Sequence, residues 1–148
     1  MTVGTYDKIQ EQLPILLEQL KQAPAYDLVK LTKGEINRIL DTKDDVPGVY
    51  LISDKNTNEY IYVGRSSKLA QRIGKDHRAI EPSQATLTRR IRDIGMPEVA
   101  CMQTARLYIY NNYNVRMIEI QDVYTRVIFE VYAALALNTG KHNSFLEH

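Results

Sequence analysis

Residues 48–72, GVYLISDKNTNEYIYVGRSSKLAQR, carry the clearest structural pattern in this chain. Residues 48–54 and 59–64 are rich in β-branched residues and tyrosine, which is typical of strands. The polar residues 55–58 between them are typical of a turn. The pattern therefore predicts a β-hairpin.

Side-chain alternation along the second strand predicts which residues share a face of the sheet. Successive side chains of a strand point to opposite faces. Tyr60 and Tyr62 are therefore expected on one face, with Ile61 and Val63 on the other.

The rest of the chain is mostly helical in pattern. Apolar residues recur at helical spacing in four segments, and a capping-box pattern (Thr32 and Glu35) starts a fifth. The predicted helices are 5–21, a short helix from Lys33, 67–78, 85–94 and 123–137, the last with Asp122 as N-cap. Residues 97–113 favour a helix, although Leu107 to Tyr110 also suit a strand, and 115–120 alternate as a third strand. Pro14 is expected to kink or split the first helix.

These elements predict an α/β (α+β) fold, in which helices flank a small three-stranded, mainly antiparallel sheet. The 148 residues are enough for one compact domain. Within it, residues 1–45 are predicted to be a helical extension and residues 46–148 the main body.

Composition excludes several classes of protein. Hydrophobic residues make up 44% and charged residues 25%, the balance of an ordinary globular protein. No apolar run approaches the roughly 18 residues of a membrane helix, and no secretory signal is visible. The single cysteine, Cys101, allows no intramolecular disulfide and is expected to be a buried small hydrophobe. A cytoplasmic location is predicted.

Charge is concentrated in one segment. The net charge of the chain is +1, yet residues 65–92 hold eight Lys/Arg and two acids. This basic segment predicts a face that binds anions, although an Arg-rich helix surface in contact with water would have the same composition.

Glu130 is the least expected residue of the predicted helix 123–137. An apolar stripe runs along that helix, and Glu130 borders it. The stripe consists of Val123, Val127, Val131, Ala134 and Leu135. A carboxylate beside a core needs a compensating cation, and either an arginine or a metal ion would serve.

Two short triplets complete the pattern. Eleven residues separate Gly48-Val49-Tyr50 from Tyr62-Val63-Gly64, and Arg72, Glu130 and Asn143 come next in order. The arrangement resembles that of the GIY-YIG nuclease family, over about residues 47–145. The segment from Tyr62 to Arg72 is the closest match.

The resemblance implies a metal-dependent endonuclease that hydrolyses phosphodiester bonds of DNA with one Mg²⁺ (or Mn²⁺) ion held by Glu130. Arg72 would bind phosphate oxygens, and Tyr62 would orient water or the scissile phosphate. Tyr50 would be the general base, which requires its pKa to be lowered from about 10. Gly48, Gly64 and Asn143 would support the site.

The match is incomplete at one position. Many family members place a His or Tyr four residues after the arginine, where this chain has Asp76. His77 follows directly and is predicted to take part in catalysis.

The basic segment is predicted to contact backbone phosphates of DNA, and the sequence leaves RNA open as a partner. The residues involved are Arg65, Lys68, Lys75, Arg78, Arg89, Arg90 and Arg92. Specificity would come from the shape of the nucleic acid, a homodimer or a partner protein, and no membrane partner is expected.

Two other functions fit the same sequence. The fold would bind nucleic acid without cutting it, while a partner supplies the chemistry. Alternatively, the helical extension would be an interaction surface, and the tyrosines would only pack.

Overall fold

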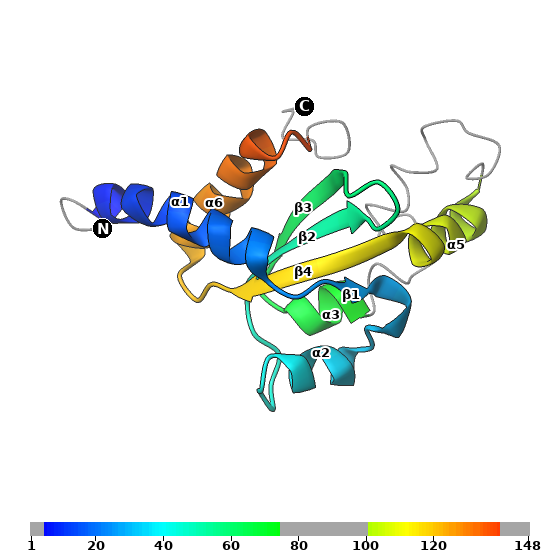
Figure 1. Cartoon of the computed structure of the whole chain (residues 1–148). Helices are drawn as coiled ribbons and strands as arrows, with labels where there is room; N and C mark the ends of the chain where they lie inside the picture. Colours follow the sequence, from blue (N-terminus) through cyan, green and yellow to red (C-terminus); the bar gives the residue numbers. More distant parts are fainter. Residues whose placement is uncertain (1–4, 75–100, 140–148) are drawn as a thin grey trace.

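The computed structural model describes residues 5–74 and 101–139 (Figure 1). In chain order the elements are α1 (Thr5–Gln22), β1 (Tyr26–Asp27), a 3-10 helix η1 (Leu28–Lys30), α2 (Lys33–Ile39), β2 (Gly48–Asp54), β3 (Tyr60–Ser66), α3 (Leu69–Gly74), α5 (Met102–Asn112), β4 (Tyr113–Glu119) and α6 (Val123–Ala136). The predicted helix 85–94 lies outside the described residues, as does the part of the predicted helix 67–78 beyond residue 74.

The strands form one antiparallel sheet in the order β1-β4-β2-β3. The predicted hairpin is confirmed as β2 and β3, with Tyr50 opposite Gly64. The predicted third strand is β4, which pairs with β2 on one side and β1 on the other. β1 was not predicted, because a two-residue strand is too short to show alternation. In the described sheet, β3 is therefore an edge strand.

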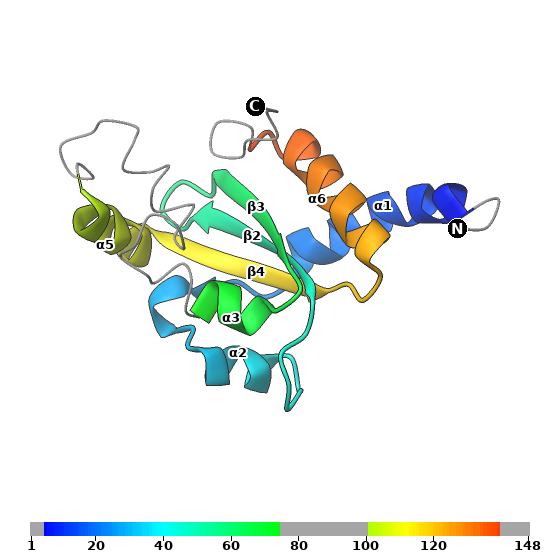
Figure 2. The ribbon, with the colours of Figure 1, turned by 180° about the vertical axis from the view of Figure 1, so that it is seen from behind.

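Helices cover both faces of the sheet (Figures 1 and 2). α2, α3 and α5 pack on the face that carries Tyr50 and Ile52. α1 and α6 pack on the opposite face, against Val49 and Leu51. Alternation along β2 thus divides its side chains between two cores.

The predicted faces of β3 are partly wrong. The pairing shifts between Ile52 and Ser53, which lie opposite Tyr62 and Tyr60, so that Ile61 is left over. An extra residue of this kind is a β-bulge, and it interrupts alternation. Tyr62 therefore joins the core under α3 together with Ile61, while Tyr60 packs on the α1 and α6 side.

The helix starts predicted from polar caps are confirmed. Thr32 Oγ1 accepts a hydrogen bond from the backbone N–H of Glu35 at 3.2 Å. Asp122 Oδ2 accepts one from the N–H of Thr125 at 2.8 Å. Each cap satisfies a backbone donor that a helix leaves without an internal partner.

Pro14 was expected to kink or split the first helix, and the split is wrong, because α1 runs unbroken from Thr5 to Gln22. Pro14 cannot donate to the carbonyl of Gln10. Both residues are exposed, which places the gap in the hydrogen-bond ladder on the outer side of α1.

The expectation of a buried Cys101 is also wrong, since this residue is exposed. It precedes α5, where its backbone N–H donates to Thr104 Oγ1 at 3.2 Å. A residue at the start of a surface helix stays near solvent.

Candidate active site at the edge of the sheet

The two triplet tyrosines lie together on the α3 side of the sheet. Tyr50 is fully buried, Tyr62 is nearly so, and their ring centroids are 6.1 Å apart. The Tyr50 ring crosses Gly64 on the facing strand: a Cβ there would lie 2.3 Å from both Cζ and the hydroxyl oxygen. At Gly48 a Cβ would lie 2.1 Å from the carbonyl oxygen of Ile118. Each triplet glycine is therefore needed for a close approach.

Arg72 joins the two tyrosines from the last turn of α3. Its guanidinium donates hydrogen bonds to the hydroxyls of Tyr50 and Tyr62. Burial lowers the pKa of Arg72, but the two tyrosines raise it, and the net pKa lies above its usual value. Because phenols are uncharged at neutral pH, Arg72 remains a positive charge held in a fixed place.

The surroundings of Tyr50 do not provide the low pKa that a general base requires. Burial raises the pKa of Tyr50 well above 10, and the neighbouring Tyr62 raises it further. Arg72 acts in the opposite direction, while the carboxylate of Glu130 adds to the rise. Among the described residues, the causes that keep the hydroxyl protonated therefore outweigh the one cation that opposes them.

Asp45 holds the helix that carries Arg72. Its Oδ1 accepts from the backbone N–H of Ala70 at 2.7 Å, and its Oδ2 accepts from that of Gln71 at 2.8 Å. The N–H of Leu69 donates to the carbonyl of Val46 at 2.8 Å. Three successive amides at the start of α3 are thus bound by the segment just before β2. The sequence pattern did not predict this contact, because it joins residues 25 positions apart.

The face of α6 that packs on the sheet differs from the predicted one. The stripe was expected to face the core, but four of its five members are exposed, and Ala134 alone is buried. The exposed members are Val123, Val127, Val131 and Leu135. The helix instead packs through Phe129, Ala133 and the nearly buried Arg126, which donates to the carbonyls of Ile120 and Gln121.

Glu130 nevertheless lies largely inside, at the boundary between the packed and exposed faces of α6. Its side chain is 14% exposed, and Oε1 accepts a hydrogen bond from Arg65 Nε at 3.2 Å. The Arg65 side chain is 45% exposed. Burial raises the pKa of Glu130, while the charge and hydrogen bonds of Arg65 and the charge of Arg72 lower it, and the net shift is upward.

The two groups of residues approach each other across β3. Gly64 and Arg65 are neighbours in that strand and pair with Tyr50 and Val49, which belong to opposite cores. Arg72 affects the pKa of Glu130, and Glu130 affects that of Tyr50. The structure therefore brings Tyr50, Tyr62, Arg72 and Glu130 to one region around the edge strand.

Many of the predicted nucleic-acid contacts lie outside the described residues. Of the basic set, Arg65 and Lys68 are described and exposed, and Arg65 contacts Glu130. The remaining five members lie outside the described ranges: Lys75, Arg78, Arg89, Arg90 and Arg92. The predicted site residues His77 and Asn143 also lie outside them.

Among the described residues of this region, Glu130 is the carboxylate that could hold a metal ion. Within residues 5–74 and 101–139, no group of three or more His, Cys, Asp or Glu side chains is arranged to hold a metal. Mg²⁺ is commonly bound through one or two carboxylates together with waters and substrate phosphates. A partly buried Glu130 with Arg65 on one oxygen fits that mode.

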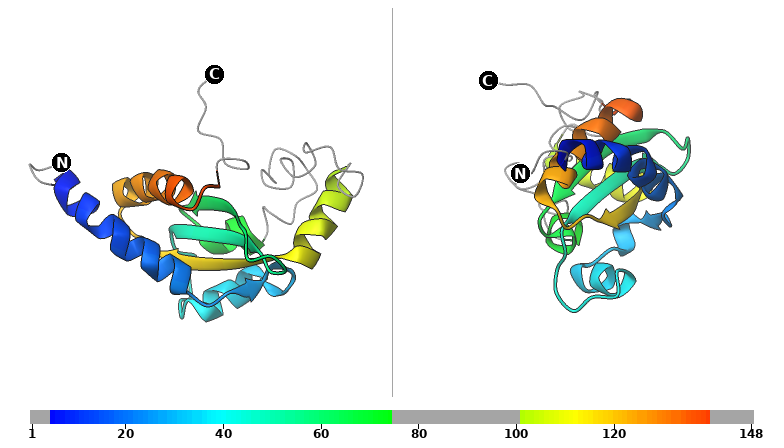
Figure 3. Two further views of the ribbon diagram at one scale, coloured as in Figure 1. Left: turned by 45° about the horizontal axis from the view of Figure 1, so that its top comes forward. Right: turned by 90° about the vertical axis from the view of Figure 1, so that its left-hand side faces the viewer.

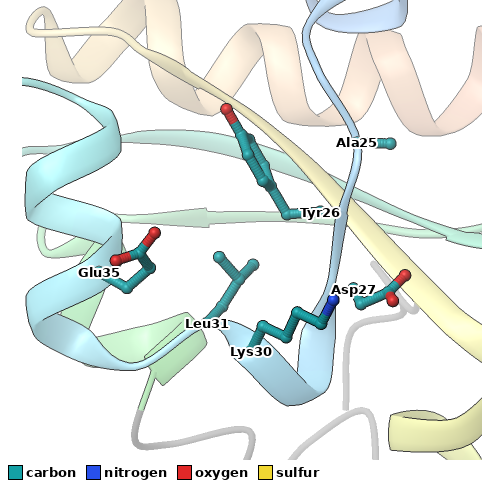
Figure 4. A pocket seen from close by; sticks show the side chains of 6 residues that line it. All are labelled: Ala25, Tyr26, Asp27, Lys30, Leu31 and Glu35. Atoms are coloured by element: carbon teal, nitrogen blue, oxygen red, sulfur yellow. The ribbon is translucent and has the colours of Figure 1, made fainter.

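A separate pocket of about 290 Å³ lies between β1, η1 and α2 (Figure 4). Tyr26, Asp27, Lys30 and Glu35 line it. Asp27 forms an ion pair with Lys55 at 3.8 Å, and Glu35 is bound by Arg38. Its carboxylates are thus already compensated, and none of the predicted site residues that the structure describes lines it.

Comparison with known families assigns the chain. A family model of the GIY-YIG catalytic domain matches residues 46–132, more than half of the sequence. The chain therefore belongs to the GIY-YIG family, as the triplets predicted. No match was found among curated proteins or among solved structures.

Family membership supports a nuclease-type function directed at phosphodiester bonds of nucleic acid. GIY-YIG nucleases generally use divalent metals. Within the described part of the chain, every helix is too short or too polar to cross a bilayer.

Proposed function

We propose that this chain is a divalent-metal-dependent endonuclease that cuts DNA, and the panel below also tests RNA. The observation that carries the proposal is Arg72, which is held by the hydroxyls of Tyr50 and Tyr62 near the partly buried Glu130. A fixed guanidinium fork matches two phosphate oxygens, and a nearby carboxylate suits a hard cation.

Each residue has a separate task in this proposal. Glu130 would hold one Mg²⁺ or Mn²⁺ ion, which supplies charge stabilisation at the phosphoryl and leaving oxygens. Arg72 binds the nonbridging oxygens, and Tyr62 orients the water or the phosphate. Tyr50 would be the general base. Burial is the largest cause of its raised pKa, and positive charge near Glu130 would offset only the smallest cause, so this role requires cleavage that increases through the alkaline range.

The Arg65–Glu130 ion pair favours a second candidate, a module that binds nucleic acid without cutting it. Glu130 is largely buried and already paired with Arg65, so it has a structural role without any metal. In that case Arg65 and Lys68 would hold phosphates, and a partner would supply the chemistry.

A cleavage panel separates the two candidates. Labelled duplex DNA, flaps, branched junctions, single strands and RNA are incubated with Mg²⁺ or Mn²⁺. Wild type is compared with Glu130→Ala, Arg72→Ala and Tyr50→Phe. Glu35→Ala is the matched control, since it removes an exposed Glu–Arg pair away from the site.

Cutting by wild type and Glu35→Ala alone would support the nuclease. Salt-sensitive binding of nucleic acid, without cutting by wild type or any variant, would support the non-cleaving binding module. Equal cutting by all five proteins would reject the assigned residues.

A further inference from the structure

The side of α6 that faces away from the sheet has the composition of a buried surface. We call Val123, Tyr124, Val127, Val131 and Leu135 the outer face of α6; at 3.6 residues per turn they occupy one contiguous side of the helix. Tyr124 is 58% and Leu135 is 78% exposed. A helix at a protein surface normally places charged or polar residues on this side.

Both charged residues of α6 point elsewhere. Arg126 is nearly buried against backbone carbonyls, and Glu130 is bound to Arg65. The outer face therefore carries no formal charge. It continues into an apolar groove of about 470 Å³ between α6 and α1, to which Tyr6 and Leu13 contribute from α1. Figure 3 shows the two helices on the same side of the sheet.

We propose that two copies of this chain form a twofold dimer through the outer face of α6. A twofold contact places the same surface on both subunits, so any charge would meet its own copy. An uncharged valine and leucine stripe avoids that repulsion. Two copies of the outer face, each with Tyr6, would bury on the order of 1,000 Å² in total, which is about the least that a specific interface requires.

The chemistry of this face disfavours two other occupants. Nucleic acid requires Lys or Arg for its phosphates, and the outer face has neither. A helix that lies on a membrane surface is typically flanked by Lys and Arg on its polar side, and α6 has one arginine, which is nearly buried.

Sedimentation equilibrium of the full chain across a wide concentration range tests the dimer without any nucleic acid or metal. Wild type is expected at twice the mass of the chain. The double variant Val127→Asp/Val131→Asp and the single variant Leu135→Glu are expected to weaken association at least 100-fold. Leu107→Asp, an exposed apolar residue on α5, is the matched control and should leave the dimer intact.

The result does not depend on the proposed nuclease function, since an inactive chain would still dimerise. Circular dichroism checks that each variant folds. A wild type that stays monomeric at every concentration overturns the dimer, including the case in which another protein or the C-terminal residues cover the face. So does a dimer that the α6 variants leave unchanged.

Discussion

The two sides of β3 hold their charged side chains in different ways. On the α3 side, the cation Arg72 is held by two neutral phenols, in a core where Tyr50 is fully buried. On the α6 side, Glu130 is held by an opposite charge, Arg65, whose side chain is 45% exposed. A phenol orients a guanidinium without neutralising it, whereas an ion pair largely cancels its own field.

The contrast indicates that only the α3 side is ready to bind an anion such as phosphate. The α3 side presents an oriented positive charge. The α6 side is compensated and must exchange its arginine contact, or use its second carboxylate oxygen, before it holds a cation. The following predictions test this contrast.

The largest effect is expected from removing the Tyr50 hydroxyl. Tyr50→Phe should lower the cleavage rate by about 10²–10⁴-fold if this group is the general base. Because the pKa of Tyr50 is raised, its hydroxyl is protonated at neutral pH, and the deprotonated fraction grows only in the alkaline range. The wild-type rate should therefore increase through the alkaline range, measured as rate against pH under single-turnover conditions. Tyr26→Phe, in another part of the molecule, is the control, and a pH-independent wild-type rate would contradict the assignment.

Gly64→Ala should damage the α3 side directly. The new methyl group would lie 2.3 Å from the Tyr50 ring, which is buried and has no room to withdraw. We expect a loss of about 1–3 kcal/mol in the free energy of unfolding, measured by urea denaturation. Gly34→Ala is the matched control, since a Cβ at Gly34 meets nothing within 4 Å. Equal stability of the two variants would show that the close approach is not tight.

Asp45→Ala should loosen α3 and, through it, Arg72. Loss of a carboxylate that caps two amides is expected to cost about 0.5–2 kcal/mol of stability. Cleavage should fall by roughly tenfold, because small misplacements of a positioning group are costly. Asp45→Asn retains one acceptor oxygen and should recover part of both losses. Asp44→Ala, in the same loop, is the control; an unaltered rate in Asp45→Ala would show that the cap does not position Arg72.

The smallest effect is expected from Glu130→Gln on the α6 side. Removing one partner of an ordinary ion pair lowers the free energy of unfolding, but here we expect no loss. The pKa of Glu130 in the fold is raised above 4.5, so its ionisation opposes folding as the pH rises through the folded pKa. Glu130→Gln should therefore be as stable as wild type or slightly more stable at pH 7. The difference should shrink as the pH falls below 4.5 and vanish near about pH 3, where the glutamate is protonated in both the folded and the unfolded chain.

Thermal unfolding across pH measures this difference. Glu35→Gln is the control with the opposite sign, because Arg38 lowers the pKa of Glu35. A Glu130→Gln variant that is clearly less stable at pH 7 would show that the ion pair stabilises the fold.

Much of the α3 side was predictable because its signals are local. The triplets are separated by a short turn, and Arg72 follows Gly64 by eight residues, so one hairpin and one helix place Tyr50, Tyr62 and Arg72. The faces of Tyr60 and Ile61 were not predictable, because the bulge that separates them depends on how β3 pairs with β2.

The α6 side was less predictable because the helix is apolar around much of its circumference. Periodicity identified a helix, but both of its sides are apolar, so the pattern alone does not show which side packs. Phe129 and Ala133 form the packed side in the structure, and the valine stripe is exposed. The semi-buried position of Glu130 was still expected, since it borders the stripe on either arrangement.

The amino-acid sequence alone was sufficient for the hairpin, the helix starts at Thr32 and Asp122, and the family, because each depends on residues that are close together in the chain. The contact of Asp45 with α3, the pairing of Glu130 with Arg65 and the exposed side of α6 required the folded molecule. These features join segments 25 to 65 residues apart, and packing selects them from several arrangements that the same local pattern allows.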